Sequence, residues 1–265
     1  MTFDQYKITK HTGFAHVEFN RPKVLNAFEH ETWIQYRKLL LELDKDPEVK
    51  VIVISGAGDH LTAGLDLKDA IKGMGSFAGK TQEDLYDHIK DFQDAIGVST
   101  RISTPTIILI HGVCYGLGVD ILSTASIRVV SKNSKISIKE IQVGLPADMG
   151  SLQRFPRIVG NSSLANRLAL TGEDFGWETA LRLGLVDEAD VVGTKADGLK
   201  RCFELASQIA KWEDWCIRGT KLCLSEVSES KTSVQGGLET IAGYNKVNLN
   251  PTAFSKSLLK RISKL

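Results

Sequence analysis

Three carboxylates in the second half of the chain are the first candidates for chemistry. Asp120, Glu140 and Asp148 are each flanked by residues that should be buried, as in Val119-Asp-Ile-Leu122. Acidic side chains are seldom buried without a partner or a purpose, and burial raises their pKa toward the range useful for proton transfer. The pattern favours acid–base catalysis. The alternative is a structural role, as ion-pair partners or, for Asp148 before Gly150-Ser151, as a helix cap.

Two glycine-containing loops could supply a second kind of chemistry. They run from Ser55 to Asp66 and from His111 to Asp120, and each leaves an apolar strand and enters a helix. Such junctions present unpaired backbone N–H groups, and two of them facing each other could hold one developing oxyanion. Taken alone, the sequence favours two ordinary strand-to-helix turns, so the oxyanion site depends on a match to a known motif.

The elements that must position these groups follow from periodicity. We expect a β-hairpin over 6–20, a helix over 30–44, buried strands at 51–54 and 106–110, helices over 85–98 and from 117, and short strands at 127–131 and 135–138. Residues up to about 192 therefore predict an α/β fold of successive β-β-α turns. After Gly193 helical stretches follow, over 199–211, 215–227 and 234–247. This tail should pack against the core or another subunit.

Composition excludes several classes of function. The 265 residues carry 33 Lys and Arg against 32 Asp and Glu, so no global field favours nucleic acid or an acidic membrane. No apolar run approaches the roughly 18 residues of a membrane span. The six histidines and four cysteines have no metal-ligand spacing, which predicts no metal site and free thiols. Nucleotide-binding and serine-hydrolase motifs are also missing.

The last three residues carry a possible address. Ser263-Lys264-Leu265 is the tripeptide read by the peroxisomal import receptor, although it could be a chance ending. It predicts a peroxisomal matrix protein. Because peroxisomes handle acyl-CoA and related small molecules, it also favours an enzyme.

In its loops and carboxylates, the chain resembles the enoyl-CoA hydratase/isomerase, or crotonase, superfamily. The resemblance covers about 14–190 and rests on Asn20-Arg-Pro-Lys-Val-Leu-Asn-Ala27, Ala63-Gly-Leu-Asp-Leu67, the loop His111-Gly to Gly118, and Gly144-Leu-Pro146. It implies a spiral core over 1–193 with the acyl-CoA site, and a helical region over 194–265 that assembles a homotrimer or homohexamer.

The resemblance also implies how the site is built. The oxyanion hole would be made by the backbone N–H groups of Leu65 and Leu117, where hydratases commonly carry small residues. Substrate would contact residues of both loops, namely Ala63, Gly64, Leu65, Asp66, Leu67 and Leu117.

Within this family the carboxylates select the reaction. Asp120 and Glu140 match the two glutamates of hydratases, and Asp148 stands where hydratases carry a small residue. All three together resemble the Δ3,5-Δ2,4-dienoyl-CoA isomerase subgroup, which implies a 1,5-proton shift in the β-oxidation of unsaturated fatty acids. By analogy Glu140 serves C2 and Asp148 serves C6, an order that stays open, while Asp120 tunes them. No cofactor is implied, because CoA enters with the substrate.

Other functions remain open on the sequence. On the same fold, the chain could be a hydratase or a Δ3-Δ2-enoyl-CoA isomerase. From another class, it could be a catalytically inactive acyl-CoA-binding or scaffold protein. Asp148 argues against the former, and acids at all three positions argue against the latter.

Overall fold

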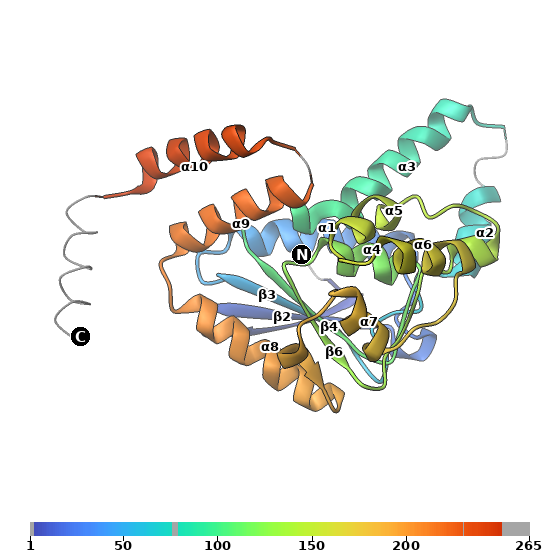
Figure 1. The fold of residues 1–265 in the computed structure, drawn as a ribbon. Coiled ribbons are helices and arrows are strands. Elements are labelled where there is room, and N and C mark those ends of the chain that lie inside the picture. The colour runs from blue at the N-terminus through green and yellow to red at the C-terminus, as the bar shows by residue number, and fades with distance from the viewer. Residues whose placement is uncertain (1–2, 76–78, 230, 251–265) are drawn as a thin grey trace.

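A six-stranded sheet forms the centre of the molecule (Figure 1). The structure is a computed structural model and describes residues 3–75, 79–229 and 231–250. The strand order is β1 (Tyr6–His11), β2 (Phe14–Phe19), β3 (Val51–Gly56), β4 (Thr106–Ile110), β6 (Ile127–Ser131) and β8 (Val191–Val192). Only the opening hairpin β1–β2 is antiparallel, and the other pairs are parallel. The predicted hairpin and strands are thus confirmed.

A second, smaller sheet accompanies the first, and the chain passes through both as it winds into a spiral. Strands β5 (Val113–Tyr115) and β7 (Lys135–Ser137) pair in parallel, and single bridges join Thr62 to Cys114 and Phe28 to Leu65. Each turn of the chain therefore adds to both sheets before entering a helix. The predicted α/β class and β-β-α spiral are confirmed.

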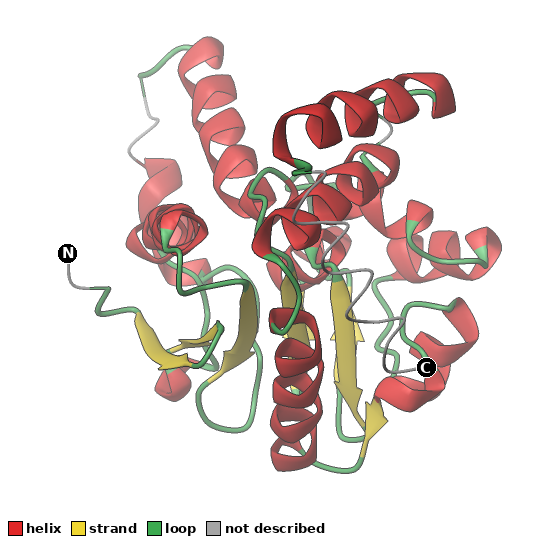
Figure 2. Cartoon of the chain, turned by 90° about the vertical axis from the view of Figure 1, so that its left-hand side faces the viewer, coloured by secondary structure: helices red, strands yellow, loops and turns green. Residues whose placement is uncertain are grey.

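Helices surround the sheet, as Figure 2 shows. They are α1 (His30–Lys45), α2 (Leu67–Gly75), α3 (Gln82–Ile96), α4 (Leu117–Thr124), α5 (Ser151–Arg154), α6 (Ser162–Thr171), α7 (Trp177–Leu183), α8 (Lys195–Ala210), α9 (Asp214–Ser228) and α10 (Val234–Asn248). The three predicted C-terminal helices are present. Strands β5 and β8 and helices α2, α5, α6 and α7 were not predicted individually.

Both faces of the sheet are covered by apolar side chains. Side chains alternate along a strand, so Ile52 and Ile54 of β3 face the core that contains α1, α3 and α4. Val51 and Val53 face the opposite core, where Cys202 of α8 packs. Burial on both sides explains why this strand is a continuous β-branched run. Helix α8 therefore packs on the sheet, as expected for at least part of the tail.

The last helices lie farther from the sheet. Helix α9 is tied to the core by an ion pair of 3.0 Å between Arg218 and Asp44, and by the buried Lys221, whose Nζ donates to the Ser99 carbonyl. Helix α10 has no buried residue and packs on α9 through Tyr244. Residues Ser263, Lys264 and Leu265 lie outside the described residues.

Candidate active site

The two glycine-containing loops run side by side. The Leu61 amide donates to the His111 carbonyl at 2.9 Å, and the Thr62 amide donates to the Val113 carbonyl at 3.1 Å. The Tyr115 amide returns a bond to the Thr62 carbonyl, also at 3.1 Å. These bonds continue the register of the small sheet, so the loops are a fixed part of the fold rather than two independent turns.

The backbone just before Leu65 lies against the start of helix α4, which begins at Leu117. Gly64, at φ +91°, lies so close that a Cβ on it would be 3.4 Å from the Leu117 nitrogen and 2.7 Å from the Tyr115 carbonyl oxygen. Leu117 is the first residue of α4, where helix geometry leaves its amide without an internal partner. Within the part of the chain that the structure describes, neither the Leu65 amide nor the Leu117 amide donates to another protein group. Free amide donors at the ends of such loops can bind an oxyanion.

A buried asparagine, Asn26, fixes the first loop through hydrogen bonds to its backbone. Asn26 has a left-handed backbone, with φ 55°, and its Nδ2 donates to the Ala57 and His60 carbonyls at 2.9 and 2.8 Å. Its Oδ1 accepts from the Arg21 amide at 2.9 Å. Asn26 lies in a segment that carries the family resemblance, but no role was predicted for it. Asparagine is among the few non-glycine residues that tolerate a left-handed backbone, so the residue type was the one sequence signal for this conformation.

Thr62 carries the same support to the oxyanion loop. Its hydroxyl donates to the Asn26 carbonyl at 2.8 Å and accepts from the Gly64 amide at 3.0 Å. The backbone just before Leu65 is therefore fixed by a buried hydroxyl. This residue was also missed, because a threonine in a loop has no distinguishing pattern.

Asp120 lies one turn into α4 and has no solvent exposure. Its Oδ1 accepts from the Ser151 amide at 2.6 Å, whereas its buried Oδ2 has no hydrogen-bond partner among the described residues. Burial raises the pKa of Asp120 to about 7, and the negative charge of Glu140 adds to this effect. The Ser151 hydrogen bond opposes it. This carboxyl can therefore titrate near neutral pH.

Glu140 approaches the same helix from the next turn of the spiral. It begins the 3-10 helix η3 (Glu140–Val143), and its Oε1 lies 3.0 Å from where a Cβ on Gly116 would stand. Its Oε2 is buried and has no hydrogen-bond partner among the described residues. Burial, and then the charge of Asp148, raise the pKa of Glu140. The carboxyl thus lies beside the backbone that leads into Leu117.

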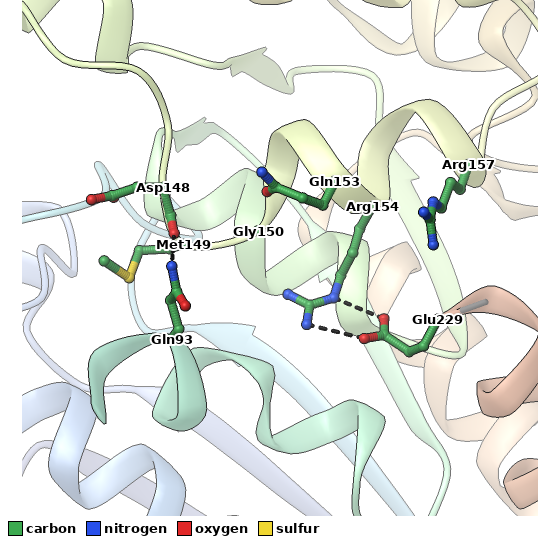
Figure 3. A pocket seen from close by; sticks show the side chains of 8 residues that line it. All are labelled: Gln93, Asp148, Met149, Gly150, Gln153, Arg154, Arg157 and Glu229. Carbon is green, nitrogen blue, oxygen red and sulfur yellow. Dashed lines mark hydrogen bonds and ion pairs between the residues drawn. The ribbon is translucent and has the colours of Figure 1, made fainter. Parts of the chain in front are cut away.

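Asp148 is half-buried, and burial raises its pKa. Its carbonyl accepts from Nε2 of Gln93 at 2.7 Å, and its carboxylate points away from this contact (Figure 3). The capping role considered for Asp148 is wrong: α5 begins at Ser151, the cap position is Gly150, and no side chain caps it.

The three acids share one electrostatic environment. Charges on Glu140 and Asp148 both raise the pKa of Asp120, and across the described ranges none of the three forms an ion pair with Lys, Arg or His. The structural ion-pair alternative therefore finds no support. Carboxyls with raised pKa values can transfer a proton next to a carbonyl whose oxygen is held by free backbone amides.

The remaining residues predicted to contact substrate follow the first loop into helix α2. Leu65 and Leu67 expose apolar side chains, with 37% and 56% of their surface accessible. The Asp66 carboxylate accepts from the Lys68 and Asp69 amides at 3.1 and 3.3 Å, so it stabilises the first turn of α2. The roles of Ala63, Gly64 and their neighbours toward substrate remain predictions.

The described residues contain no candidate metal cluster and no candidate membrane-spanning helix. Over these ranges no group of three or more His, Cys, Asp or Glu could hold a metal ion. Nor is any described helix long and apolar enough to cross a membrane. All four cysteines are free thiols, as predicted.

Comparison with known proteins gives consistent matches. A model of the family described as enoyl-CoA hydratase/isomerase matches residues 9–235. The peroxisomal Delta(3,5)-Delta(2,4)-dienoyl-CoA isomerase of Arabidopsis thaliana is 36% identical over 260 residues, which is 94% of this chain and 92% of that protein. The mitochondrial enzyme of the same name from Rattus norvegicus is 32% identical over 253 residues, covering 94% and 76%. A putative enoyl-CoA hydratase from Streptomyces coelicolor has a TM-score of 0.85 at 23% identity, covering 98% and 93%.

Proposed function

Because the chain belongs to the enoyl-CoA hydratase/isomerase family, we propose that it converts 3,5-dienoyl-CoA thioesters into 2,4-dienoyl-CoA thioesters. The observation that carries the proposal is Asp148, a third acid with a raised pKa beside Asp120 and Glu140. The relatives named for this activity, at 36% and 32% identity, support it.

The reaction moves one proton and no electrons leave the substrate. A base removes a proton from C2, and the electron pair shifts through the diene while negative charge builds on the thioester oxygen. A second acid then donates a proton to C6, which leaves double bonds at C2 and C4. The Leu65 and Leu117 amides stabilise the oxygen, and loss of one such donor costs on the order of 100-fold in rate.

Each acid has a proposed part in this shift. Glu140 lies next to the backbone before Leu117, which suits removal of the C2 proton beside the thioester. Asp148 would serve C6. Asp120 has no exposed surface, so it acts on the other two through charge, and mutual repulsion keeps one carboxyl protonated while another is ionised.

Hydrogen exchange can decide the order of the two acids. In D2O, Asp148→Asn should still exchange the C2 hydrogen of a 3,5-dienoyl-CoA without forming product, because only the C6 step is lost. Glu140→Gln should stop that exchange. The reverse pattern would assign C2 to Asp148.

The activity itself is tested by spectrophotometry. The protein mixed with 3,5-octadienoyl-CoA should produce the near-ultraviolet absorbance of the conjugated 2,4-dienoyl thioester. No metal or redox cofactor need be added. Hydration of a 2-enoyl-CoA at a rate rivalling isomerisation would identify a hydratase instead. Tight acyl-CoA binding without either reaction would identify a binding protein.

Location and assembly belong to the same proposal. The Arabidopsis relative is named peroxisomal and the Rattus relative mitochondrial. Peroxisomal import through Ser263-Lys264-Leu265 stays a prediction. A fluorescent protein fused ahead of Met1 should collect in peroxisomes, and removal of the three residues should disperse it. In a second fusion, the fluorescent protein follows Leu265. Mitochondrial fluorescence from that fusion would contradict a peroxisomal location.

A further inference from the structure

The segment from Asp148 to Ser151 carries two contacts on which the proposed chemistry depends. It holds the Asp148 carboxylate, and its Ser151 amide donates to Asp120. The preceding residues, 141–146, are all exposed, whereas Ala147 and Met149 are buried in the main apolar core. Apolar packing therefore anchors the segment, and polar contacts can fix its orientation.

Two polar contacts, one from helix α3 and one within reach of helix α9, hold the segment and the helix that follows it, as Figure 3 shows. Gln93 of α3 donates to the Asp148 carbonyl at 2.7 Å. Arg154 of α5 makes a two-pronged ion pair with Glu229, with N–O distances of 2.8 and 3.2 Å. The two side chains of this ion pair are only 19% and 14% exposed. Paired bonds of this kind fix orientation as well as distance.

The shape of the backbone fits this ion pair. Gly150 has φ +124°, and a Cβ on it would overlap the Arg154 guanidinium. A Cβ on Gly97 would lie 3.3 Å from Nη2 of the same side chain. The guanidinium therefore lies between two stretches of bare backbone. A cavity of about 380 Å³ adjoins these groups, and its lining includes Asp148 as well as Arg154 and Glu229.

We propose that Arg154 and Glu229 are positioning residues, whose ion pair connects the end of helix α9 to the segment carrying Asp148 and Ser151. The inference rests on the proposed function and deepens it. Glu229 follows directly after α9, so the docking of that helix bears on the placement of Asp148. Neither residue touches the reacting atoms.

The test compares two ion pairs of similar burial. Glu229→Gln removes the Arg154 partner, and Asp190→Asn removes the partner of Arg201, an N–O pair of 2.8 Å with side chains 28% and 13% exposed. We expect Glu229→Gln to lower kcat about tenfold with little change in KM, while Asp190→Asn leaves kcat unchanged at the same loss of melting temperature. Equal kcat for both variants would overturn the proposal.

A double-mutant cycle separates positioning from general damage. If Glu229 acts through Asp148, Glu229→Gln should change the residual rate of Asp148→Asn by less than about twofold. The same tenfold loss in both backgrounds would contradict the inference. Should Glu229→Gln fail to fold, Arg154→Lys provides the comparison, because it keeps the positive charge but cannot make the two-pronged contact with Glu229.

A readout without turnover keeps this inference separate from the proposed function. Amide hydrogen exchange over 148–154 should become about tenfold faster in Glu229→Gln and stay unchanged in Asp190→Asn. If the wild type does not isomerise dienoyl-CoA, the proposed function fails. Amide exchange still tests whether the Arg154–Glu229 ion pair fixes the segment that carries Asp148, and unchanged exchange in Glu229→Gln would refute that role.

Discussion

Asp148 and Glu140 are the residues on which turnover should depend most directly. We expect Asp148→Asn and Glu140→Gln each to lower kcat by about 100-fold or more, because each amide keeps the shape of the acid but cannot transfer the proton. Acyl-CoA affinity should change little, since the acids act in the transition state. The dienoyl-CoA assay measures the first effect and calorimetric titration the second. Near-native kcat in both variants would disprove the mechanism.

Asp120 should make the stability of the protein depend on pH. Its pKa is raised from 3.8 to about 7 in the folded state, so the fold favours the protonated form. Stability contributed by that proton is present below about pH 4 and is lost as the pH rises to about 7. Asp120→Asn removes the titration but retains an acceptor for the Ser151 amide.

The variant should therefore gain stability relative to the wild type between pH 5 and pH 8. The raised pKa sets an upper limit of about 4 kcal/mol on that gain. Glu140 and Asp148 titrate in both proteins, so their direct contributions largely cancel in the difference. Thermal unfolding measured across this range provides the comparison. A difference that does not vary with pH would show that Asp120 is ionised throughout.

At the residue scale, the three acids were predictable from the sequence, but the residues that hydrogen-bond to the segments around them were not. Asp120 in an apolar helix is visible as a pattern, because burial of a charge is unusual. Asn26, Gln93 and Arg154 are polar residues in unremarkable surroundings. Their roles come from bonds to groups far away in the sequence, such as Gln93 to the Asp148 carbonyl, 55 positions apart, and Arg154 to the Glu229 carboxylate, 75 positions apart. Local pattern contains no such information.

At the scale of elements, the oxyanion loop should be intolerant of any side chain at Gly64. Alanine there would place a Cβ 2.7 Å from the Tyr115 carbonyl oxygen, against backbone that the small sheet fixes. The Leu65 amide would shift, so we expect Gly64→Ala to lower kcat by about 100-fold. Stability should fall as well, because φ +91° is strained for alanine.

Gly79 offers a matched control for this prediction. It has φ +83° and nothing within 4 Å of an added Cβ. Gly79→Ala should therefore show the conformational strain without the loss of kcat. Assays of both variants well below their melting temperatures make the comparison. Equal activity losses would mean that backbone strain, not displacement of the amide, is responsible.

The long elements were predictable and the short ones were not. Helix α1 has a clear apolar stripe, and β3 and β4 are buried runs of branched residues. Strand β5 has three residues and is ordered by β7, which lies farther along the chain. Its formation is a tertiary effect. The oxyanion loops likewise depend on long-range pairing, which explains why sequence alone favoured ordinary turns.

At the scale of the whole molecule, the last two helices present apolar residues to solvent. They are exposed on α9 and α10, namely Leu224, Val227, Val234, Leu238 and Val247. Exposed apolar surface of this extent is typical of interaction sites. The predicted homotrimer or homohexamer would have three or six times the chain mass of 29.1 kDa.

Light scattering should show such a mass, and Leu238→Glu should lower it without loss of folded structure, because α10 has no buried residue. Leu170→Glu, at an exposed position on α6, is the control and should keep the wild-type mass. A wild-type mass equal to one chain would contradict the prediction.

Helix α4 has a consequence for how new enzymes could arise from this architecture. Its eight residues begin with the Leu117 amide and include Asp120 one turn later, whereas Asp148 belongs to a separate segment. Under the proposed mechanism, the Leu117 amide and Asp120 are thus inherited as one rigid unit, while the Leu65 amide comes from a different loop. A descendant gene could then change which carbon receives hydrogen by mutating the segment of Asp148 alone, which would leave the α4 donor and its acid intact.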